Sequence, residues 1–262
     1  MRQLLTHTSG LRADIPDAEL KAIRDSASLM ARVMRETPRV APGSRVIYSD
    51  LNAILLGEVV RRASGEPLDR FAAREIFEPL GLHGTMFRPP ARLRPLIAPT
   101  GMWHGHSIAG VVNDGSAFKL GGVSGNAGLF APAMDIARFA QFVMRGGTRP
   151  PPGGGRLVRA ETMKLFTAKA TDFGPRTEAR ALGWQAVPTG ETVSSAGTLF
   201  GPHSYGHTGW TGTSLWIDPD RDLFVVLLTN RAYTPRARKP FTVLKQVRGA
   251  VADAAARASD AS

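Results

Sequence analysis

A chain of 262 residues, 43% of them apolar, can bury a sizeable hydrophobic core, which argues against a disordered or fibrous protein. The sequence has no cysteine, which excludes disulfides, thiolate zinc sites and a cysteine nucleophile, so covalent chemistry must use an oxygen or nitrogen nucleophile. The formal net charge of +11 would suit a nucleic-acid partner, but the 33 lysines and arginines are scattered and accompany no nucleic-acid-binding motif, so we expect no such partner.

A first amphipathic helix is predicted over residues 17–35. Apolar residues recur there at steps of three and four, which places them on one face of a helix, and Pro38 ends the pattern. The apolar positions are Leu20, Ile23, Ala27, Met30 and Met34.

Further helices are expected later in the chain. Residues 48–50 stand at the junction between a loop and a second helix. A third helix is predicted from Leu68 to Ile76, and it stops before Pro79. A long stretch rich in proline and glycine follows over residues 81–128, and another helix is predicted from Met134 to Met144.

The last part of the chain, residues 147–262, is expected to form a sheet. The apolar, β-branched runs at 214–217 and 223–228 are joined by Asp-Pro-Asp-Arg, which predicts an antiparallel hairpin, and another strand is expected around His207. Apolar residues then recur at helical spacing, so a final helix is expected to pack on the sheet. Its apolar positions are Leu244, Val247, Val251 and Ala254.

Three short segments carry the signal for function. They are Leu-Leu-Thr-His-Thr-Ser-Gly at 4–10, Tyr-Ser-Asp at 48–50 and His-Thr-Gly at 207–209. In this order they resemble the Leu-Leu-x-His-x-Ser-Gly, Tyr-x-Asn and Lys-Thr-Gly or His-Thr-Gly elements of class C beta-lactamase-like serine hydrolases, which include penicillin-binding proteins and esterases. One segment alone is a weak signal, but the ordered set spans nearly the whole chain.

The resemblance implies an α/β (α+β) fold in which an antiparallel sheet is flanked by helices and joined to a mainly helical lobe over residues 11–146, with the site between the lobes. Residues 1–262 are then a single, partial domain. The implied ligand is a small molecule or a peptidoglycan-like substrate. No stretch is long enough for a membrane span, and residues 1–7 are no signal peptide. The protein is therefore expected in the periplasm or outside the cell if a signal peptide lies upstream, and in the cytoplasm otherwise.

The resemblance also assigns roles to individual residues. Tyr48 would act as general base on the nucleophilic serine, together with a lysine one helical turn after that serine in a Ser-x-x-Lys arrangement. His207 and Thr208 would contact a substrate carboxylate or ester from the strand that borders the pocket. Gly209 would let the substrate approach the backbone closely, and the backbone N–H of Trp210 would be one oxyanion-hole donor.

Asp50 is expected to bind substrate, but with a substrate preference that differs from that of the best-known lactamases. The best-known lactamases have asparagine at this position, and His207 replaces the lysine of Lys-Thr-Gly. Both differences argue against efficient beta-lactam hydrolysis, whereas esterase and peptidase relatives accept the aspartate.

Two pairs of side chains look like sites but are expected to have ordinary roles. His7 and Ser9 match structural residues of the loop behind the pocket, where a serine can cap a helix or turn. His104 and His106 have no third ligand nearby, so we expect no metal site. No cofactor is implied either.

The nucleophilic serine is missing from the pattern. Only Ser116 is followed by a lysine three residues later, and it comes after Tyr48 rather than before it. Flanking glycines predict a loop there, whereas the motif needs a helix to bring both side chains to one face. We expect a mis-called start or a gene fragment, with two strands and the serine helix encoded upstream. Their absence would leave the 223–228 strand near an exposed apolar edge.

Two functions remain open at this point. The first is a serine hydrolase that transfers the acyl group of an ester, an amide or a D-alanyl peptide bond, inactive as written because the Ser-x-x-Lys helix is absent. The alternative is a non-catalytic relative that binds cell-wall peptides or similar ligands. A nucleic-acid-coating protein would show steep salt dependence of binding and has little else in its favour.

Overall fold

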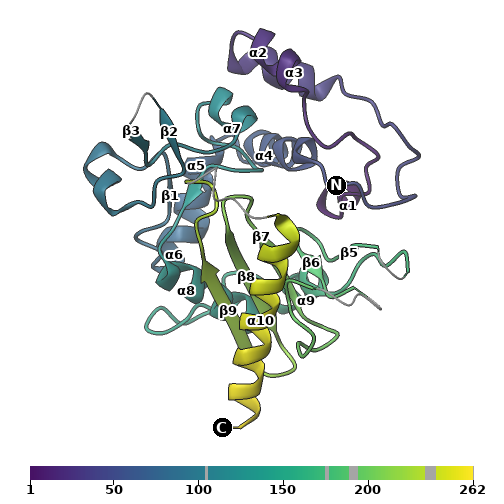
Figure 1. The fold of residues 1–262 in the computed structure, drawn as a ribbon, viewed down its shortest axis with the longest axis vertical. Coiled ribbons are helices and arrows are strands. Elements are labelled where there is room, and N and C mark those ends of the chain that lie inside the picture. Colours follow the sequence, from purple (N-terminus) through teal and green to yellow (C-terminus); the bar gives the residue numbers. More distant parts are fainter. Residues whose placement is uncertain (104–105, 175–176, 189–193, 234–239, 262) are drawn as a thin grey trace. The chain divides into compact units, whose positions relative to one another are not determined.

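The computed structural model describes residues 1–103, 106–174, 177–188, 194–233 and 240–261, and its ribbon is shown in Figure 1. The chain divides into two compact units. The first comprises Met1–Glu78 and His83–Ala131, and the second comprises Pro79–Leu82 and Pro132–Ser262. Each unit has its own hydrophobic cluster, so each is described separately.

The first unit is mainly helical. It begins with α1 (Arg2–Leu5), α2 (Asp17–Ala22), α3 (Ser26–Met34) and α4 (Asp50–Ser64). Gly65 closes α4 in the left-handed conformation, as expected for a helix that ends at glycine. The hydrophobic cluster of this unit joins α3 and α4 to the chain that precedes α2. Its buried members are Leu11, Ile15, Leu29, Val33, Leu51 and Ile54.

The predicted helix over residues 17–35 is two helices, α2 and α3. The chain leaves the helical conformation at Ile23, and the Asp25 side chain then accepts a hydrogen bond from the Ser28 N–H as an N-cap of α3. The predicted face of the second half was only partly right, since Met30 packs against the cluster but Ala27 is exposed. Leu29 and Val33 are buried, whereas Met34 is exposed, because the break shifts the phase of the helix.

The third predicted helix also runs differently. It consists of α5 (Leu68–Ala72), a π-turn (Ala73–Phe77) and α6 (Glu78–Leu80), and so continues past Pro79. A continuous α-helix would need an N–H at Pro79 and would bring its ring against the preceding turn. The π-turn changes the hydrogen-bond register just before this residue, which lets the chain stay coiled.

The rest of the first unit contains short elements. Strand β1 (Met86–Phe87) pairs antiparallel with β4 (Leu129–Phe130), and β2 (Gly101–Trp103) pairs antiparallel with β3 (His106–Ile108). A 3₁₀-helix spans Ala91–Leu96. The predicted loop at Ser116–Lys119 is a short helix, α7 (Gly115–Lys119), because Asp114 caps it by accepting the Ala117 N–H.

The second unit is built on a five-stranded antiparallel sheet in the order β5-β6-β7-β8-β9. The predicted hairpin is β8 (Thr213–Asp218) with β9 (Leu223–Leu228), and the strand predicted around His207 is β7 (Tyr205–Thr208). The structure confirms both. The short strands β5 (Ala179–Arg180) and β6 (Gln185–Ala186) have no clear period in the sequence and were not predicted, nor was α9 (Ala160–Thr167).

Helices cover both faces of this sheet. In Figure 1, α10 (Phe241–Asp260) lies along the strands, and its Ala252 and Ala256 pack with Trp216 of β8. The other face is covered by α8 (Ala133–Met144), which contacts β8 and β9. The predicted helix at 134–144 is therefore confirmed, and the sheet flanked by helices agrees with the expected fold class.

The predicted apolar face of the C-terminal helix was wrong. Val247 and Val251 are exposed, and the side that faces the sheet instead contains small residues and one arginine. These are Arg248, Gly249, Ala252 and Ala256. Small side chains let the helix approach the sheet closely, and a Cβ at Gly249 would collide with the Ser194 carbonyl.

Strand β9 is an edge of the sheet. All six of its residues are apolar, and Leu228 at its end is exposed. Within the part of the chain that the structure describes, the outer side of β9 makes no backbone hydrogen bond to another segment. In the same described ranges, none of the helices has the length and apolar character needed to cross a bilayer.

Candidate active site

Tyr48 lies in the first unit, immediately before α4, in a segment that is fixed by buried neighbours. The buried Ser49 donates its hydroxyl to the Arg12 carbonyl at 2.6 Å and its backbone N–H to Nδ1 of His7 at 3.1 Å. The rings of His7 and Tyr48 are in contact, with centroids 4.5 Å apart. Tyr48 nevertheless stays 43% exposed, so its phenol is held in place and is reachable from solvent.

Asp50 is the first residue of α4, and it lies in a group of three carboxylates. Oxygens of Asp14, Asp50 and Asp114 all lie within 4.8 Å of one another. Burial, with the nearby charges of Asp114 and Asp14, raises the pKa of Asp50 to about 7, although a hydrogen bond with Tyr48 opposes the shift. Three such oxygens could bind a cation, or they can share protons.

Ser9 and His7 have structural contacts in this unit. The Ser9 hydroxyl donates to Oδ1 of Asn52 at 2.6 Å and accepts the backbone N–H of Leu11. Nδ1 of His7 lies 3.1 Å from Nδ2 of Asn52, in addition to its bond from Ser49. These bonds tie the loop after α1 to α4. His104, considered for a metal pair with His106, lies outside the described residues.

The one Ser-x-x-Lys of the chain is helical but is engaged elsewhere. Ser116 is buried, and its hydroxyl donates to Oδ1 of Asp14 at 3.3 Å. The Lys119 ammonium donates to the backbone carbonyl of Ile23. Each side chain therefore has its own partner, and Lys119 is not hydrogen bonded to Ser116 as it would be in an activated nucleophile. The prediction of a loop at these residues was wrong, but Ser116 and Lys119 are still not arranged as a catalytic serine and lysine.

The second unit contains the His207-Thr208-Gly209 segment at the end of β7 and just after it. Nδ1 of His207 lies 3.1 Å from the Thr208 carbonyl, and Nε2 lies 3.4 Å from Nη1 of Arg180. A neutral ring with its proton on Nδ1 satisfies both contacts. Burial, followed by the charge of Arg180, lowers the pKa of His207 to about 4, so the ring is neutral at physiological pH.

Arg180 is a buried charge that the sequence did not indicate. Its guanidinium forms an ion pair with Glu178 at 2.7 Å, and the same carboxylate accepts a bond from Gln185. Where the resembled segment often has a lysine, this strand thus has a neutral histidine with an arginine behind it. Arg180 lies in a run of residues without clear periodicity, so nothing in the sequence distinguishes it from the other arginines.

A tight turn follows His207 and leads into β8. The Gly209 N–H donates to the Thr213 carbonyl at 2.7 Å, and the Gly212 N–H donates back to the Gly209 carbonyl at 3.1 Å. A Cβ at Gly209 would collide with the Thr213 hydroxyl, so a larger residue there would force the Thr213 side chain to move. Trp210 projects from this turn and is 49% exposed, with the Arg231 guanidinium 5.0 Å from its ring centroid.

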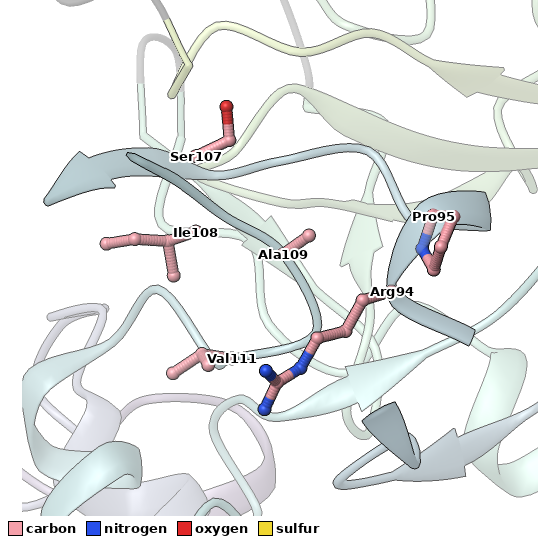
Figure 2. A pocket seen from close by; sticks show the side chains of 6 residues that line it. All are labelled: Arg94, Pro95, Ser107, Ile108, Ala109 and Val111. Atoms are coloured by element: carbon pink, nitrogen blue, oxygen red, sulfur yellow. The ribbon is translucent and has the colours of Figure 1, made fainter. Parts of the chain in front are cut away.

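A separate hollow lies in the first unit beside the β2–β3 hairpin. Figure 2 shows the Arg94 side chain extending across it toward Val111, with Ile108 on the strand above. It is lined by Arg94, Pro95, Ser107, Ile108, Ala109 and Val111. None of the residues predicted for the site is among them.

Comparisons with known proteins agree with these segments. The family model described as Beta-lactamase matches residues 1–248. The chain belongs to the Beta-lactamase family. It is 37% identical over 259 residues to an Escherichia coli K12 protein named "Putative D-alanyl-D-alanine carboxypeptidase", covering 89% of this chain and 57% of that protein. The chain therefore spans little more than half the length of this relative.

Solved structures show the same fold at low sequence identity. A beta-lactamase/D-alanine carboxypeptidase from Pseudomonas syringae matches with a TM-score of 0.67 and 19% identity, over 95% of this chain and 70% of that one. EstCE1, described as a hydrolase with promiscuous acyltransferase activity, matches with a TM-score of 0.68 and 19% identity, over 96% of this chain and 71% of that one. At these identities the likeness concerns the fold.

Proposed function

We propose that this Beta-lactamase-family chain is part of a serine hydrolase that transfers the acyl group of an ester, an amide or a D-alanyl peptide bond. In this proposal a serine hydroxyl attacks the carbonyl carbon while its proton passes to the Tyr48 oxygen, which acts as the base together with the lysine of the Ser-x-x-Lys helix. The leaving alcohol or amine takes that proton as the carbonyl bond breaks. Water then attacks the acyl-serine by the same route in reverse and releases the acid.

The observation that carries the proposal is the state of Tyr48. Its neighbours His7 and Ser49 are buried and hydrogen bonded, and its side chain is hydrogen bonded to Asp50, yet Tyr48 stays 43% exposed, which is the combination that a positioned and reachable base requires. Tyr205 differs, since burial raises its pKa to about 12 and keeps it protonated. The turn at 209–213 supports the second role, stabilisation of the oxyanion by the Trp210 N–H.

The nucleophile is proposed to be a serine on a Ser-x-x-Lys helix that is not among these 262 residues, since Ser116 and Lys119 are bonded elsewhere. This chain alone is then inactive. The proposed substrates are D-alanyl peptides, as in the name of the Escherichia coli relative, and other acyl compounds such as esters, in keeping with EstCE1, which is described as a hydrolase with promiscuous acyltransferase activity. Asp50 and the neutral His207 favour these acyl compounds over beta-lactams.

The test is a mass measurement of the protein from its native source, with and without a fluorophosphonate serine probe. The expected result is a mass above that of the 262-residue chain and a single probe adduct, which disappears when the labelled serine is changed to alanine. A mass equal to this chain with no adduct would contradict the proposal. The protein would then be the non-catalytic relative, which binds a D-alanyl peptide without cleaving it.

A matched pair of variants tests the role of Tyr48. Tyr48→Phe is expected to slow probe labelling by about 10²- to 10⁴-fold, the usual contribution of a general base. Tyr205→Phe also removes one phenolic hydroxyl, but from the buried side of β7, and is expected to label within about threefold of the parent because it takes no part in proton transfer. Equal labelling of the two variants would exclude Tyr48 as the base.

A further inference from the structure

The turn between β7 and β8 has its carbonyl groups bound from outside the turn. Thr229 donates its hydroxyl to the Gly212 carbonyl at 2.6 Å. Arg231 donates its backbone N–H to the Thr211 carbonyl at 2.8 Å and its guanidinium to the Trp210 carbonyl at 3.4 Å. The carbonyls of Gly209 and Thr213 each accept a backbone N–H within the turn, from Gly212 and Gly209 respectively. From outside the turn, both are also bound by a single side chain of α10, that of Arg248.

Arg248 binds these two carbonyls through one nitrogen. Its Nη2 lies 2.9 Å from the Gly209 oxygen and 2.8 Å from the Thr213 oxygen. The residue is buried, and burial, with the nearby charge of Arg231, lowers its pKa to about 10, which leaves it a cation at neutral pH. Burying a cation is unfavourable, so its place in the packed face of α10 needs a specific reason.

The backbone of α10 at this point is fixed from two directions. Gly249 lies directly against the Ser194 carbonyl, where a larger residue would not fit. One turn further along, the Asp253 carboxylate accepts the backbone N–H groups of Thr198 and Leu199 at 2.7 and 2.9 Å. The Arg248 side chain therefore extends from an anchored base to the turn.

The bond to Gly209 has a consequence for its neighbour. The Gly209 C=O and the Trp210 N–H belong to one planar trans peptide group, in which they point in opposite directions. An interaction that fixes the direction of the carbonyl therefore fixes the direction of the amide hydrogen. The Gly212 N–H and Arg248 both bind this carbonyl, and the bond to Arg248 holds it toward α10, so that the Trp210 N–H points away from α10.

We propose that Arg248 is a positioning residue that orients the Trp210 N–H for the developing oxyanion, by holding the Gly209 carbonyl on the opposite side of the same peptide. The inference rests on the proposed function for its catalytic meaning, whereas the orientation itself can be measured without turnover. Since both bonds come from one nitrogen, a lysine ammonium that reaches this point can replace them in part.

The chain offers a selective readout of this peptide. Gly-Trp occurs only at 183–184 and 209–210, so protein labelled with ¹³C-carbonyl glycine and ¹⁵N-tryptophan gives two carbonyl–nitrogen cross-peaks. Arg248→Met is expected to move or broaden the Gly209–Trp210 peak and to leave the Gly183–Trp184 peak in place. Arg248→Lys should lie between Arg248→Met and the parent. Arg257→Met, an exposed arginine on the same helix, should change neither peak.

Two results in this spectrum would overturn the inference. One is an unchanged Gly209–Trp210 peak in Arg248→Met. The other is an equal change of both peaks, which would show general loosening of the unit rather than a local reorientation.

The catalytic consequence is tested in the polypeptide that carries the probe-reactive serine. Arg248→Met is expected to lower kcat for an ester by about 10- to 100-fold, with KM changed less than about threefold, because a misdirected donor weakens binding of the transition state and not of the substrate. Arg248→Lys should restore most of the loss. A raised KM with unchanged kcat would overturn the catalytic role.

Failure of the proposed function looks different in these experiments. If the parent protein shows no turnover and no probe adduct, the hydrolase proposal fails while the two cross-peaks still report whether Arg248 orients the 209–210 peptide. If the parent is active and the Gly209–Trp210 peak ignores Arg248, only this inference fails.

Discussion

Asp50 shows how the surroundings of one residue change its chemistry. In the sequence it looks like a variant of the Tyr-x-Asn asparagine, and in the fold it lies beside Asp14 and Asp114. Its pKa is raised to about 7 in the folded protein, above the value of about 4 for an aspartate in an unfolded chain. The protonated carboxyl therefore stabilises the fold at acidic pH, and this stabilisation is lost as pH rises from about 4 to about 7.

Asp50→Asn is expected to raise the free energy of unfolding by about 1 kcal/mol at pH 8 and to leave it nearly unchanged at pH 4, because asparagine resembles the protonated acid. Urea denaturation at the two pH values measures the difference. Asp222→Asn is the control, since Asp222 is exposed and lies in the left-handed conformation that asparagine also accepts. A gain at Asp50 that is the same at both pH values would refute the role of charge.

Among the elements, β9 is unusual because it is an edge strand of the sheet and is entirely apolar. Its sequence Leu-Phe-Val-Val-Leu-Leu has neither charge nor proline, the devices by which edge strands usually avoid pairing with other chains. The helices α8 and α10 pack against this strand from the two faces of the sheet, but neither covers its outer side. The exposed apolar edge expected from the sequence is therefore present in this structure.

Leu228→Lys is expected to reduce aggregation of the 262-residue chain, because a charge at the end of the edge strand opposes pairing with another chain. The exposed position should keep the change in stability within about 0.5 kcal/mol. Light scattering over a concentration series measures the effect. Val247→Lys makes the same kind of change at an exposed position of α10, away from the edge, and an equal benefit there would point to net charge alone.

At the scale of the whole molecule, two units each contain a hydrophobic cluster of their own. Leu51 and Ile54 of α4 join Leu29 and Val33 of α3 in the first unit, while the second unit packs small residues of α10 on Trp216. The same helix α4 begins with the residues of the candidate site. Loss of packing in this cluster is therefore expected to disturb the site as well as the fold.

Leu51→Ala is expected to lower the free energy of unfolding by about 2 to 5 kcal/mol, since it leaves a cavity in a cluster where Leu51 is fully buried. Met34→Ala removes a comparable apolar side chain from an exposed position of α3 and should cost less than about 1 kcal/mol. Chemical denaturation followed by circular dichroism gives both values. Similar losses for the two variants would mean that this cluster is not the core of the first unit.

Features that depend on local pattern could be predicted from the sequence. The hairpin of β8 and β9 follows from two apolar, β-branched runs around a turn, and the start of α4 at residues 48–50 follows from the loop before it and the helical period after it. The family could also be inferred, because its motifs are short contiguous segments whose order survives without any knowledge of the fold.

Features that depend on contacts between distant residues could not be predicted in this way and are seen only in the folded structure. No local pattern brings Asp14 and Asp114 to Asp50, and none gives Arg248 a role, since an arginine among alanines in a helix normally indicates a solvent-facing position. The buried face of α10 was missed for the same reason: close approach to the sheet selects small residues, and the larger valines point to solvent. Periodicity reports hydrophobicity, whereas the site depends on which backbone and charged groups the fold brings within hydrogen-bonding distance.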